Sequence, residues 1–366
     1  MYGFAGCLMG RLALLTRLII IFMLSACGIS AKAEIASHPD NSAVVFIYHR
    51  FGETTLPSTN TRMQDFIAQL DLLEKEKFTF FSLEQIVSYM KAGKPIPDRT
   101  VAITVDDAYL SVYTHAWPEL KKRNIPFTLF VSTDHVDKAY RNYMRWEQIA
   151  EMVAAGMRVG NHSASHNHLI PWKEEQSAWR RRVTDDIERA QSRIEEKLGV
   201  RPTLFAYPYG EFSPALAVLV TELGYTGFGQ HSGAFNRESD FGFLPRFPVS
   251  EYFSDVKAFK EKALSMAFNP REMFPSDTLW TQDKPPTMNF SLPATNFASE
   301  RLRCFASGAG EIDVDVKKSS EKFSISISAT HTFRSRRFRY NCTMPSPENL
   351  RYYWYSHLWI NPQYPE

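Results

Sequence analysis

The chain has 366 residues, which is too long for one average domain and suits two. Hydrophobic residues make up 44% and charged residues 22%, the ordinary composition of a globular protein with a substantial core. The net charge of +2 gives no reason to expect nucleic acid as a partner. Aromatic residues are in excess at 14%, and they suit either a large β-rich core or surfaces that stack on sugar rings.

The N-terminus has the composition of an export signal. Arg11 and Arg17 precede the apolar run 18–24, and small residues follow that run. Positive charge, a short apolar stretch and small residues together are typical of a signal peptide. Because the run is too short to favour a transmembrane helix, we expect no membrane span in the mature chain.

Two cleavage sites compete at the end of this leader. Residues 24–27, Leu-Ser-Ala-Cys, resemble the bacterial lipobox, in which Cys27 is lipidated and becomes the new N-terminus. Residues 31–33, Ala-Lys-Ala, fit the ordinary small-x-small site. We favour the lipobox, which would anchor the protein to a membrane surface. We take residues 1–33 as the leader region that holds both sites, and it places the mature protein in the periplasm, on the cell envelope or in the medium.

Strand and helix patterns alternate from about residue 43 to residue 268. Short apolar runs predict buried parallel strands at 44–48, 101–105, 127–131, 204–206 and 225–229, and residues 158–160 lead into a His-rich loop. Helical spacing, capping patterns and terminal glycines predict helices near 63–73, 82–92, 118, 146–155, 173–198 and 214–223. Repeated βα units imply a parallel sheet with helices outside it, and their number favours a closed or nearly closed barrel. Catalytic residues of such barrels lie at the C-terminal ends of the strands.

The pattern changes from about residue 280. Short runs, two of them with strict alternation of apolar and polar residues, predict strands at 289–292, 302–305, 312–316, 323–328, 337–340 and 352–359. We expect a small β-sandwich-like accessory domain at 287–366, joined to the domain at 43–268 by the Pro-rich linker 269–286. Cys304 and Cys342 lie in this region and lack CxxC partners, so an oxidising compartment favours a disulfide over a zinc site.

Two adjacent carboxylates follow the predicted strand at 101–105. Asp106 and Asp107 would repel each other if both were merely buried. One interpretation is an acidic turn after a strand. In the other, one aspartate binds a metal and its neighbour is held nearby as a general base.

Two histidines form the next motif. His162 and His166 are four residues apart, so they can point the same way if the segment makes one helical turn. Neutral imidazole is the usual ligand of zinc-like metals. With one aspartate these histidines make a two-His-one-carboxylate set, which leaves metal positions open for water and substrate and suits hydrolysis of an amide or ester. His168 is expected to be a neighbour rather than a ligand.

The segment 207–210, Tyr-Pro-Tyr-Gly, ends another predicted strand. It is either a plain Pro-Gly turn or a rigid turn that presents a backbone N–H to a developing oxyanion. With this third motif the sequence resembles the polysaccharide deacetylase family, the NodB-homology domains of carbohydrate esterase family 4. The family's Thr-Phe-Asp-Asp-Gly is matched by residues 104–108, its His-Ser/Thr-x-x-His by 162–166 and its Pro-Tyr-Gly by 208–210. The resemblance covers about residues 43–250 and implies an α/β fold, a distorted (β/α)7 barrel, beside the smaller β-sandwich-like domain.

The resemblance also implies roles for individual residues. Asp107, His162 and His166 would hold a divalent metal, zinc by default for this ligand set, with cobalt, nickel or manganese as alternatives. Asp106 would be the general base, and the Tyr209 backbone N–H would stabilise the oxyanion together with the metal. The expected reaction is hydrolysis of an acetamido group on a sugar, which releases acetate from an extracellular or envelope polysaccharide of the N-acetylglucosamine type.

The sequence departs from the family pattern at three places. Ala108 replaces a glycine, which is tolerable if its φ is negative. The family's arginine that orients the base falls at Ala206; Arg246 is our candidate replacement, unless it forms a surface salt bridge. The late Leu-x-His motif, whose histidine is the general acid, is not evident. His49 and His231 are candidates for that role, and the alternative for each is a structural or surface histidine.

Alternatives to the N-deacetylase remain. The Tyr-His pair at 48–49 and the missing late motif resemble the branch of the family that acts on exported poly-N-acetylglucosamine. A peptidoglycan deacetylase or an O-acetyl esterase acting on xylan would use the same metal, base and oxyanion site. A non-catalytic carbohydrate-binding protein would suit the missing acid motif and the aromatic segment 352–355, but it has no evident need for both aspartates.

Overall fold

A computed structural model describes residues 41–294, 299–347 and 350–365 of the chain. The expected leader, residues 1–33 with Cys27, lies outside the described residues. Within the described ranges, none of the helices combines the length and the apolar character that crossing a bilayer requires. The described residues all fall within one compact unit.

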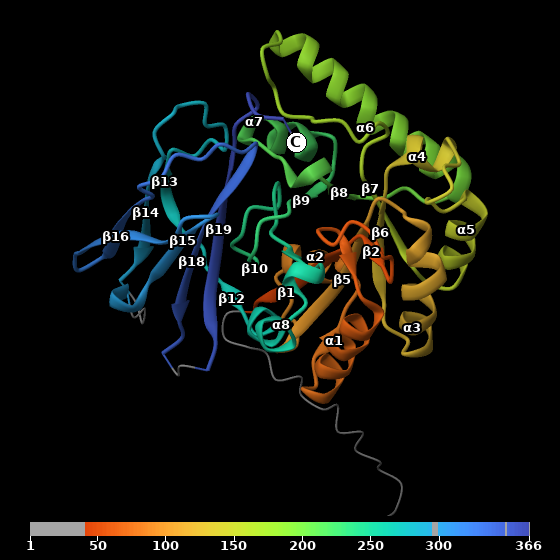
Figure 1. Ribbon diagram of the computed structural model, residues 1–366, viewed down its shortest axis with the longest axis horizontal. Helices are drawn as coiled ribbons and strands as arrows, with labels where there is room; N and C mark the ends of the chain where they lie inside the picture. Colours follow the sequence, from red (N-terminus) through yellow and green to blue (C-terminus); the bar gives the residue numbers. More distant parts are fainter. Residues whose placement is uncertain (1–40, 295–298, 348–349, 366) are drawn as a thin grey trace, which may run out of the picture. The chain divides into compact units, whose positions relative to one another are not determined.

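Parallel strands surrounded by helices form the first part of this mixed α/β fold (Figure 1). The strands are β1 (Ala43–Tyr48), β4 (Thr79–Phe80), β5 (Thr100–Asp106), β6 (Phe127–Val131), β7 (Arg158–Asn161), β8 (Leu204–Ala206), β9 (Thr226–Phe228) and β11 (Phe247–Pro248). β1 pairs with β5, and parallel pairing continues through β6, β7 and β8 to β9, while β4 pairs with the start of β5. On the other side of β1 lies β11, and Leu244, shortly before β11, forms a parallel bridge with Phe228 of β9. The segment 244–248 therefore contacts both β9 and β1.

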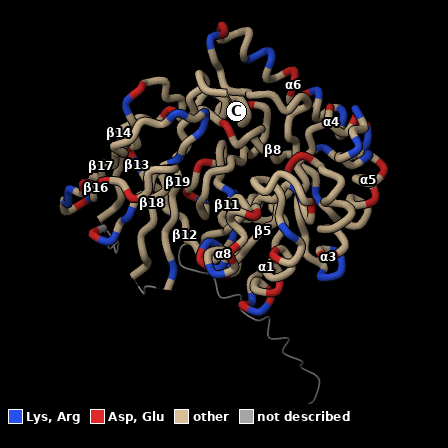
Figure 2. The backbone as a smooth tube through the Cα atoms, in the orientation of Figure 1, with Lys and Arg blue, Asp and Glu red and all other residues tan. Residues whose placement is uncertain are grey.

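Helices follow the strands where the sequence predicts them, and two short helices at 133–137 and 256–263 are additional. They are α1 (Met63–Lys75), α2 (Leu83–Lys91), α3 (Trp117–Lys122), α4 (Thr133–Asp137), α5 (Trp146–Ala154), α6 (Gln176–Leu198), α7 (Pro214–Glu222) and α8 (Val256–Ala263). α6 begins later than the expected residue 173, because the Glu175 carboxylate accepts hydrogen bonds from the first backbone N–H groups. It ends where Gly199 adopts a φ of 66°. Charges of both signs run along α6 (Figure 2), as expected of a helix with one face in solvent.

Short elements connect these strands and helices. They are β2 (Arg50–Phe51), β3 (Asn60–Thr61), β10 (Ala234–Phe235), β12 (Met266–Ala267), the short π-helix η1 (Val112–Ala116), and the short 3-10 helices η2 (Pro208–Gly210), η3 (Glu251–Phe253) and η4 (Ser299–Arg301). β2 and β3 pair with each other, outside the main sheet.

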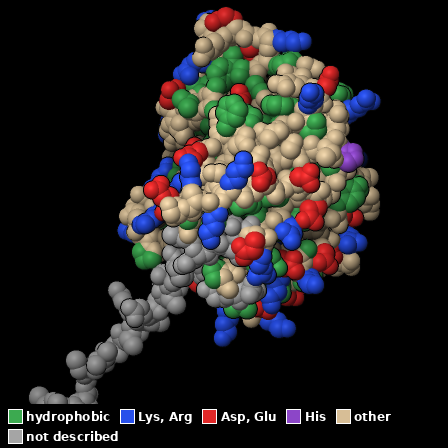
Figure 3. Space-filling view, turned by 90° about the vertical axis from the view of Figure 1, so that its left-hand side faces the viewer, with side chains coloured by type: hydrophobic (Ala, Val, Ile, Leu, Met, Phe, Trp, Pro, Cys, Tyr) green, Lys and Arg blue, Asp and Glu red, His purple; other side chains and the backbone are tan. Residues whose placement is uncertain are grey.

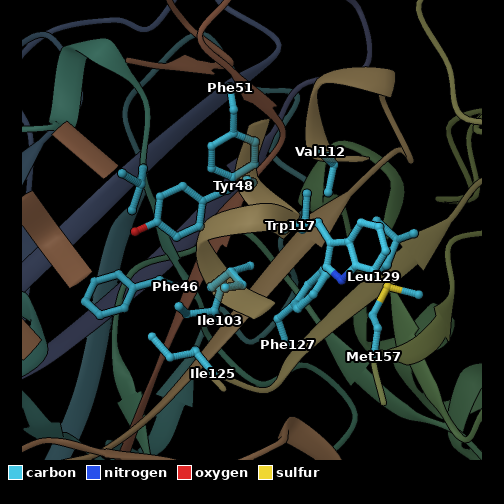
Figure 4. Packing of buried hydrophobic residues seen from close by; sticks show 14 of the residues in the cluster. Phe46, Tyr48, Phe51, Ile103, Val112, Trp117, Ile125, Phe127, Leu129 and Met157 are labelled. Carbon is cyan, nitrogen blue, oxygen red and sulfur yellow. The ribbon is translucent and has the colours of Figure 1, made fainter. Parts of the chain in front are cut away.

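The core lies between the parallel strands and the helices that cover them. Phe46 of β1, Ile103 of β5 and Leu129 of β6 are at most 1% exposed and belong to one apolar cluster with Trp117 of α3 (Figure 4). Full burial of a side chain of this size contributes about 1.5–3 kcal/mol. This packing holds the strands in register, so the polar residues after their C-terminal ends meet at one edge.

Antiparallel strands form the C-terminal part. They are β13 (Arg271–Phe274), β14 (Thr287–Pro293), β15 (Arg303–Ala306), β16 (Gly310–Lys318), β17 (Lys322–Ser328), β18 (Arg337–Pro345) and β19 (Tyr352–Ile360). The strands predicted from the sequence are present, and β13 is an additional strand inside the expected linker. β14 pairs with β13 and β17, β17 pairs with β16, and β15 joins β16 to β18 and so to β19. The predicted disulfide between Cys304 and Cys342 joins β15 to β18.

Strand pairing continues from the C-terminal strands to β1. β19 pairs with β12, β12 with β10, and β10 with β1. The boundaries 43–268, 269–286 and 287–366 stay a prediction. The face of the molecule in Figure 3 carries acidic and basic side chains interspersed with hydrophobic ones, consistent with the net charge near zero.

Candidate metal centre and active site

The two aspartates lie at the C-terminal end of β5. Asp106 is its last residue and Asp107 follows it; both are buried. Asp107 and Ala108 adopt φ values of 74° and 62°, so the chain turns sharply here. The condition under which alanine was expected to be tolerated at position 108, a negative φ, is therefore not met. The left-handed conformation explains why glycine suits this position, and it costs an alanine about 1–2 kcal/mol.

The two histidines follow β7 on a loop. The helical turn that would place His162 and His166 on one side is absent from this described segment, because Ser163 and His166 have φ values of 61° and 54°. Hydrogen bonds shape the loop instead: Ser163 N–H donates to Asn161 Oδ1 (2.9 Å), and His166 N–H donates to Ser163 Oγ (3.0 Å). The loop still brings both imidazoles to one side, with ring centroids 4.8 Å apart.

Asp107, His162 and His166 offer three ligand atoms that lie within 4.8 Å of one another. Asp107 Oδ1 is 3.3 Å from His162 Nε2 and 3.2 Å from His166 Nε2. His162 Nδ1 lies 2.8 Å from the Ala206 carbonyl oxygen, so Nδ1 carries the proton and Nε2 presents its lone pair to the other two residues. His162 Nε2 is buried and has no hydrogen-bond partner among the described residues. Two imidazole nitrogens and one carboxylate oxygen fit a zinc-like divalent cation.

Positive neighbours keep both carboxyl groups ionised. Burial by itself would raise the pKa of Asp106, but Arg246 and His162 outweigh burial and hold the pKa below its ordinary value. Burial is likewise outweighed at Asp107, where the neighbouring imidazoles of His162 and His166 hold the pKa well below the ordinary value. Burial would lower the pKa of His162, and the charges of Asp106 and Asp107 raise it instead. The site therefore concentrates negative charge that a cation would neutralise.

Arg246 lies fully buried against Asp106 and does not form the surface salt bridge that was the alternative. Arg246 Nη1 donates to Asp106 Oδ1 (2.7 Å) and Nη2 donates to Oδ2 (2.8 Å). Its Nε donates to the Gly229 carbonyl (2.9 Å), and Nη1 also donates to Thr104 Oγ1 (3.2 Å). This fork fixes the orientation of the carboxylate. Asp106 Oδ2 lies 3.9 Å from His162 Nε2, beside the three-residue ligand set.

Tyr209 lies in the turn η2, directly after β8, with a φ of 59°. Its ring centroid is 4.6 Å from that of His166 and 4.4 Å from that of His168, on which it stacks. The structure thus brings the third sequence motif next to the second. His168 is a neighbour of the ligand set, as the sequence suggested, since its Nδ1 contacts Glu211 Oε2 at 2.9 Å.

The two candidate acids lie in different surroundings. His49 follows β1, whose Tyr48 is opposite Val105, so it is level with Asp106 at the strand ends. Burial lowers the pKa of His49 more than Asp107 and Asp106 raise it, which leaves a neutral ring at pH 7. His231 is instead buried beside Phe212, with ring centroids 5.1 Å apart. Burial and the nearby Arg339 lower the pKa of His231 to about 3.

Glu211 is a site neighbour that the sequence analysis missed. It follows Gly210, is buried, and accepts hydrogen bonds from Arg336 Nε (2.7 Å) and Arg337 Nη1 (2.8 Å). Its place directly after the Pro-Tyr-Gly motif was the available signal. The sequence could not reveal its partners, because they lie 125 and 126 residues further along the chain.

Comparison with known proteins shows the family of this chain. The family model described as polysaccharide deacetylase matches residues 93–228. The solved structure of IcaB from Ammonifex degensii is 30% identical, with a TM-score of 0.52, over 59% of this chain and 95% of that one. This chain belongs to the polysaccharide deacetylase family. It is therefore an enzyme of the hydrolase class.

Two further proteins are similar to this chain. The poly-beta-1,6-N-acetyl-D-glucosamine N-deacetylase of Staphylococcus epidermidis is 24% identical over 269 residues, which cover 66% of this chain and 92% of the relative. The Streptococcus pyogenes deacetylase PplD is 19% identical with a TM-score of 0.53, over 61% of this chain and 97% of that one. The second likeness shows a shared fold.

Proposed function

We propose that this polysaccharide deacetylase removes N-acetyl groups from an exported polymer of the N-acetylglucosamine type and releases acetate. The observation that carries the proposal is the cluster of Asp107, His162 and His166 beside Asp106, whose carboxylate is fixed by Arg246. The names of the relatives support β-1,6-linked N-acetylglucosamine as the first polymer to test. We further infer export through the leader at 1–33, with lipid attachment at Cys27.

We assign Asp107, His162 and His166 as ligands of a divalent metal, zinc by default, with cobalt, nickel and manganese as alternatives. Such a metal, when bound, polarises the acetyl carbonyl and makes the attacking water more acidic. The buried lone pair of His162 Nε2 supports this assignment, because an imidazole nitrogen without a partner is costly to bury.

The protein groups around this site suit the remaining steps of amide hydrolysis. Asp106 takes the proton from the attacking water as the new C–O bond forms, and Arg246 keeps its carboxylate ionised and oriented. The Tyr209 backbone N–H donates to the oxyanion. As the C–N bond breaks, the proton that Asp106 took from water passes through His49 to the leaving nitrogen, which departs as the free amine of the sugar. The place of His49 beside Asp106 at the strand ends supports this role.

We infer that the parallel strands form the distorted (β/α)7 barrel implied by the family. The contacts of segment 244–248 with both β9 and β1 support this inference. We infer in addition that residues 287–366 act as a β-sandwich-like accessory domain. One apolar cluster contains buried residues from β14, β16 and β17 together with buried residues from β15, β18 and β19, and this shared core supports the sandwich.

The proposed function is tested by acetate release from protein lacking residues 1–33. The substrates are β-1,6-linked N-acetylglucosamine oligomers, chitooligosaccharides and O-acetylated xylan, each with chelated protein and with zinc or cobalt restored. We expect metal-dependent release from the N-acetylated oligomers. Release from the xylan ester alone would make the protein an O-acetyl esterase. Oligomer binding without release, with metal bound, would make it a carbohydrate-binding protein.

A further inference from the structure

A row of aromatic rings extends away from the proposed metal ligand His166. The ring centroid of His135 is 5.9 Å from that of His166, and Tyr143 stacks on His135 at 5.0 Å with an interplanar angle of 10°. Tyr140 and Tyr109 flank Tyr143, with centroid distances of 6.2 and 4.7 Å. We name Tyr109, His135, Tyr140 and Tyr143 the aromatic row.

The aromatic row is accessible from solvent. Tyr140 is 48% exposed, and the other three side chains are half-buried. Among the described residues, Tyr140 and Tyr143 belong to none of the apolar clusters that make the core. Exposed rings grouped beside a reaction site are unlike core aromatics, and flat apolar rings suit the apolar face of a pyranose.

Main-chain hydrogen bonds attach the aromatic row to the loop that carries Asp107. Leu110 N–H donates to the Asn142 carbonyl (2.8 Å), and Met144 N–H donates to the Ala108 carbonyl (2.9 Å). Tyr109 and Tyr143 face each other across the same antiparallel bridge. The rings are therefore held at a set position relative to the proposed metal ligand.

Side-chain contacts hold two of the rings individually. The Arg50 guanidinium lies over the Tyr109 ring at 3.5 Å from its centroid and pairs with Glu53 at 3.0 Å. His135 Nδ1 lies 2.8 Å from Ser132 Oγ. A surface that is ordered before the ligand arrives loses less entropy on binding, which favours affinity.

We propose that the aromatic row is a sugar-binding subsite, which stacks on the pyranose unit next to the unit whose acetyl group reaches Asp107, His162 and His166. The ligand class rests on the proposed function, since a polymer of N-acetylglucosamine places such a unit beside the reacting one. The subsite gives the enzyme a preference for oligomers over single sugars.

The test measures the dissociation constant of a β-1,6-linked N-acetylglucosamine pentamer by calorimetry, and kcat/KM for the pentamer and for the single sugar N-acetylglucosamine. We expect Tyr140→Ala and Tyr143→Ala to raise the dissociation constant of the pentamer about three- to tenfold, the size of one aromatic contact. The advantage of the pentamer over the single sugar in kcat/KM should shrink with it. Tyr143→Phe keeps the ring and should bind like the wild type.

Tyr352→Ala is the matched control, because Tyr352 is 42% exposed on β19 and lies outside the aromatic row. Unchanged pentamer affinity in Tyr140→Ala and Tyr143→Ala, or an equal loss in Tyr352→Ala, overturns the subsite. So does a wild-type protein that binds no pentamer. A wild type that binds the pentamer but releases no acetate contradicts the proposed function alone, and the variant affinities then still decide the subsite.

Discussion

Glu211 and Arg336 join the turn that carries Tyr209 to the C-terminal strands. Arg336 Nε donates to Glu211 Oε1 (2.7 Å), and its Nη2 donates to Oε2 (3.0 Å). Glu211 stands two residues after Tyr209, and Arg336 directly precedes β18. The carboxylate is fully buried, so removing Glu211 takes the counterion from Arg336, whose side chain is only 11% exposed. The C-terminal region therefore supports the proposed oxyanion turn through this pair.

We predict that Glu211→Gln removes a contribution to the free energy of unfolding that the wild type has at neutral pH and loses in acid. Burial would raise the pKa of Glu211, but His168 and Arg336 outweigh it and lower the pKa from 4.5 to about 2. A carboxyl group whose pKa is lower in the folded than in the unfolded protein stabilises the fold at pH values above its unfolded pKa. This contribution, about 3 kcal/mol here, is lost as the pH falls from about 4.5 to 2. Urea unfolding across this pH range should show wild type and variant converging at low pH. Glu222→Gln, which removes an exposed partner of Arg180, should behave like the wild type. A constant difference at every pH would contradict the prediction.

Asp106→Asn should retain the metal and lose turnover. The amide can still accept one hydrogen bond from Arg246 but cannot take a proton from water, so kcat should fall by roughly 10²–10⁴. Metal content by elemental analysis and acetate release by coupled assay check the two parts. Asp134→Asn, at an ion pair with Arg189 on the surface, serves as the control. An active Asp106→Asn variant would remove Asp106 as the base.

His162→Ala should lose the metal. Removal of Nε2 leaves one imidazole and one carboxylate, too few ligands for tight binding of a zinc-like ion. The readout is the metal content after dialysis, together with the visible spectrum of cobalt-loaded protein. His168→Ala should stay stoichiometrically loaded, because His168 contacts Glu211 rather than the ligand set. Full metal content in His162→Ala would exclude it as a ligand.

His49→Ala should lower kcat by roughly 10²–10⁴ and leave the metal content unchanged. The reason is the place of His49 beside Asp106 at the strand ends, where it can reach a leaving nitrogen. His231→Ala is the comparison, since His231 is buried beside Phe212 and should affect stability more than turnover. If turnover in His49→Ala equals that of the wild type, the residue is structural and the acid lies elsewhere.

The local features of this protein could be predicted from its sequence. Strands such as β5 and helices such as α6 follow from apolar periodicity and terminal residues, which act over a few neighbouring positions. The pairs Asp106–Asp107 and His162–His166 could also be found from the sequence, because the two members of each pair lie within one short motif. Even within motifs the backbone was not predictable: the loop at 162–166 and the φ of Ala108 depend on hydrogen bonds and strand pairing around them.

The tertiary structure decided which distant residues meet. Arg246 reaches Asp106 across 140 residues, and Arg336 reaches Glu211 across 125. Packing also separated His49, beside the carboxylates, from His231, beside Phe212. These choices depend on how strands pair and side chains fill the core, which involves the whole chain at once. A single sequence shows which groups are available for such contacts, and only the packed fold brings particular partners together at hydrogen-bonding distance.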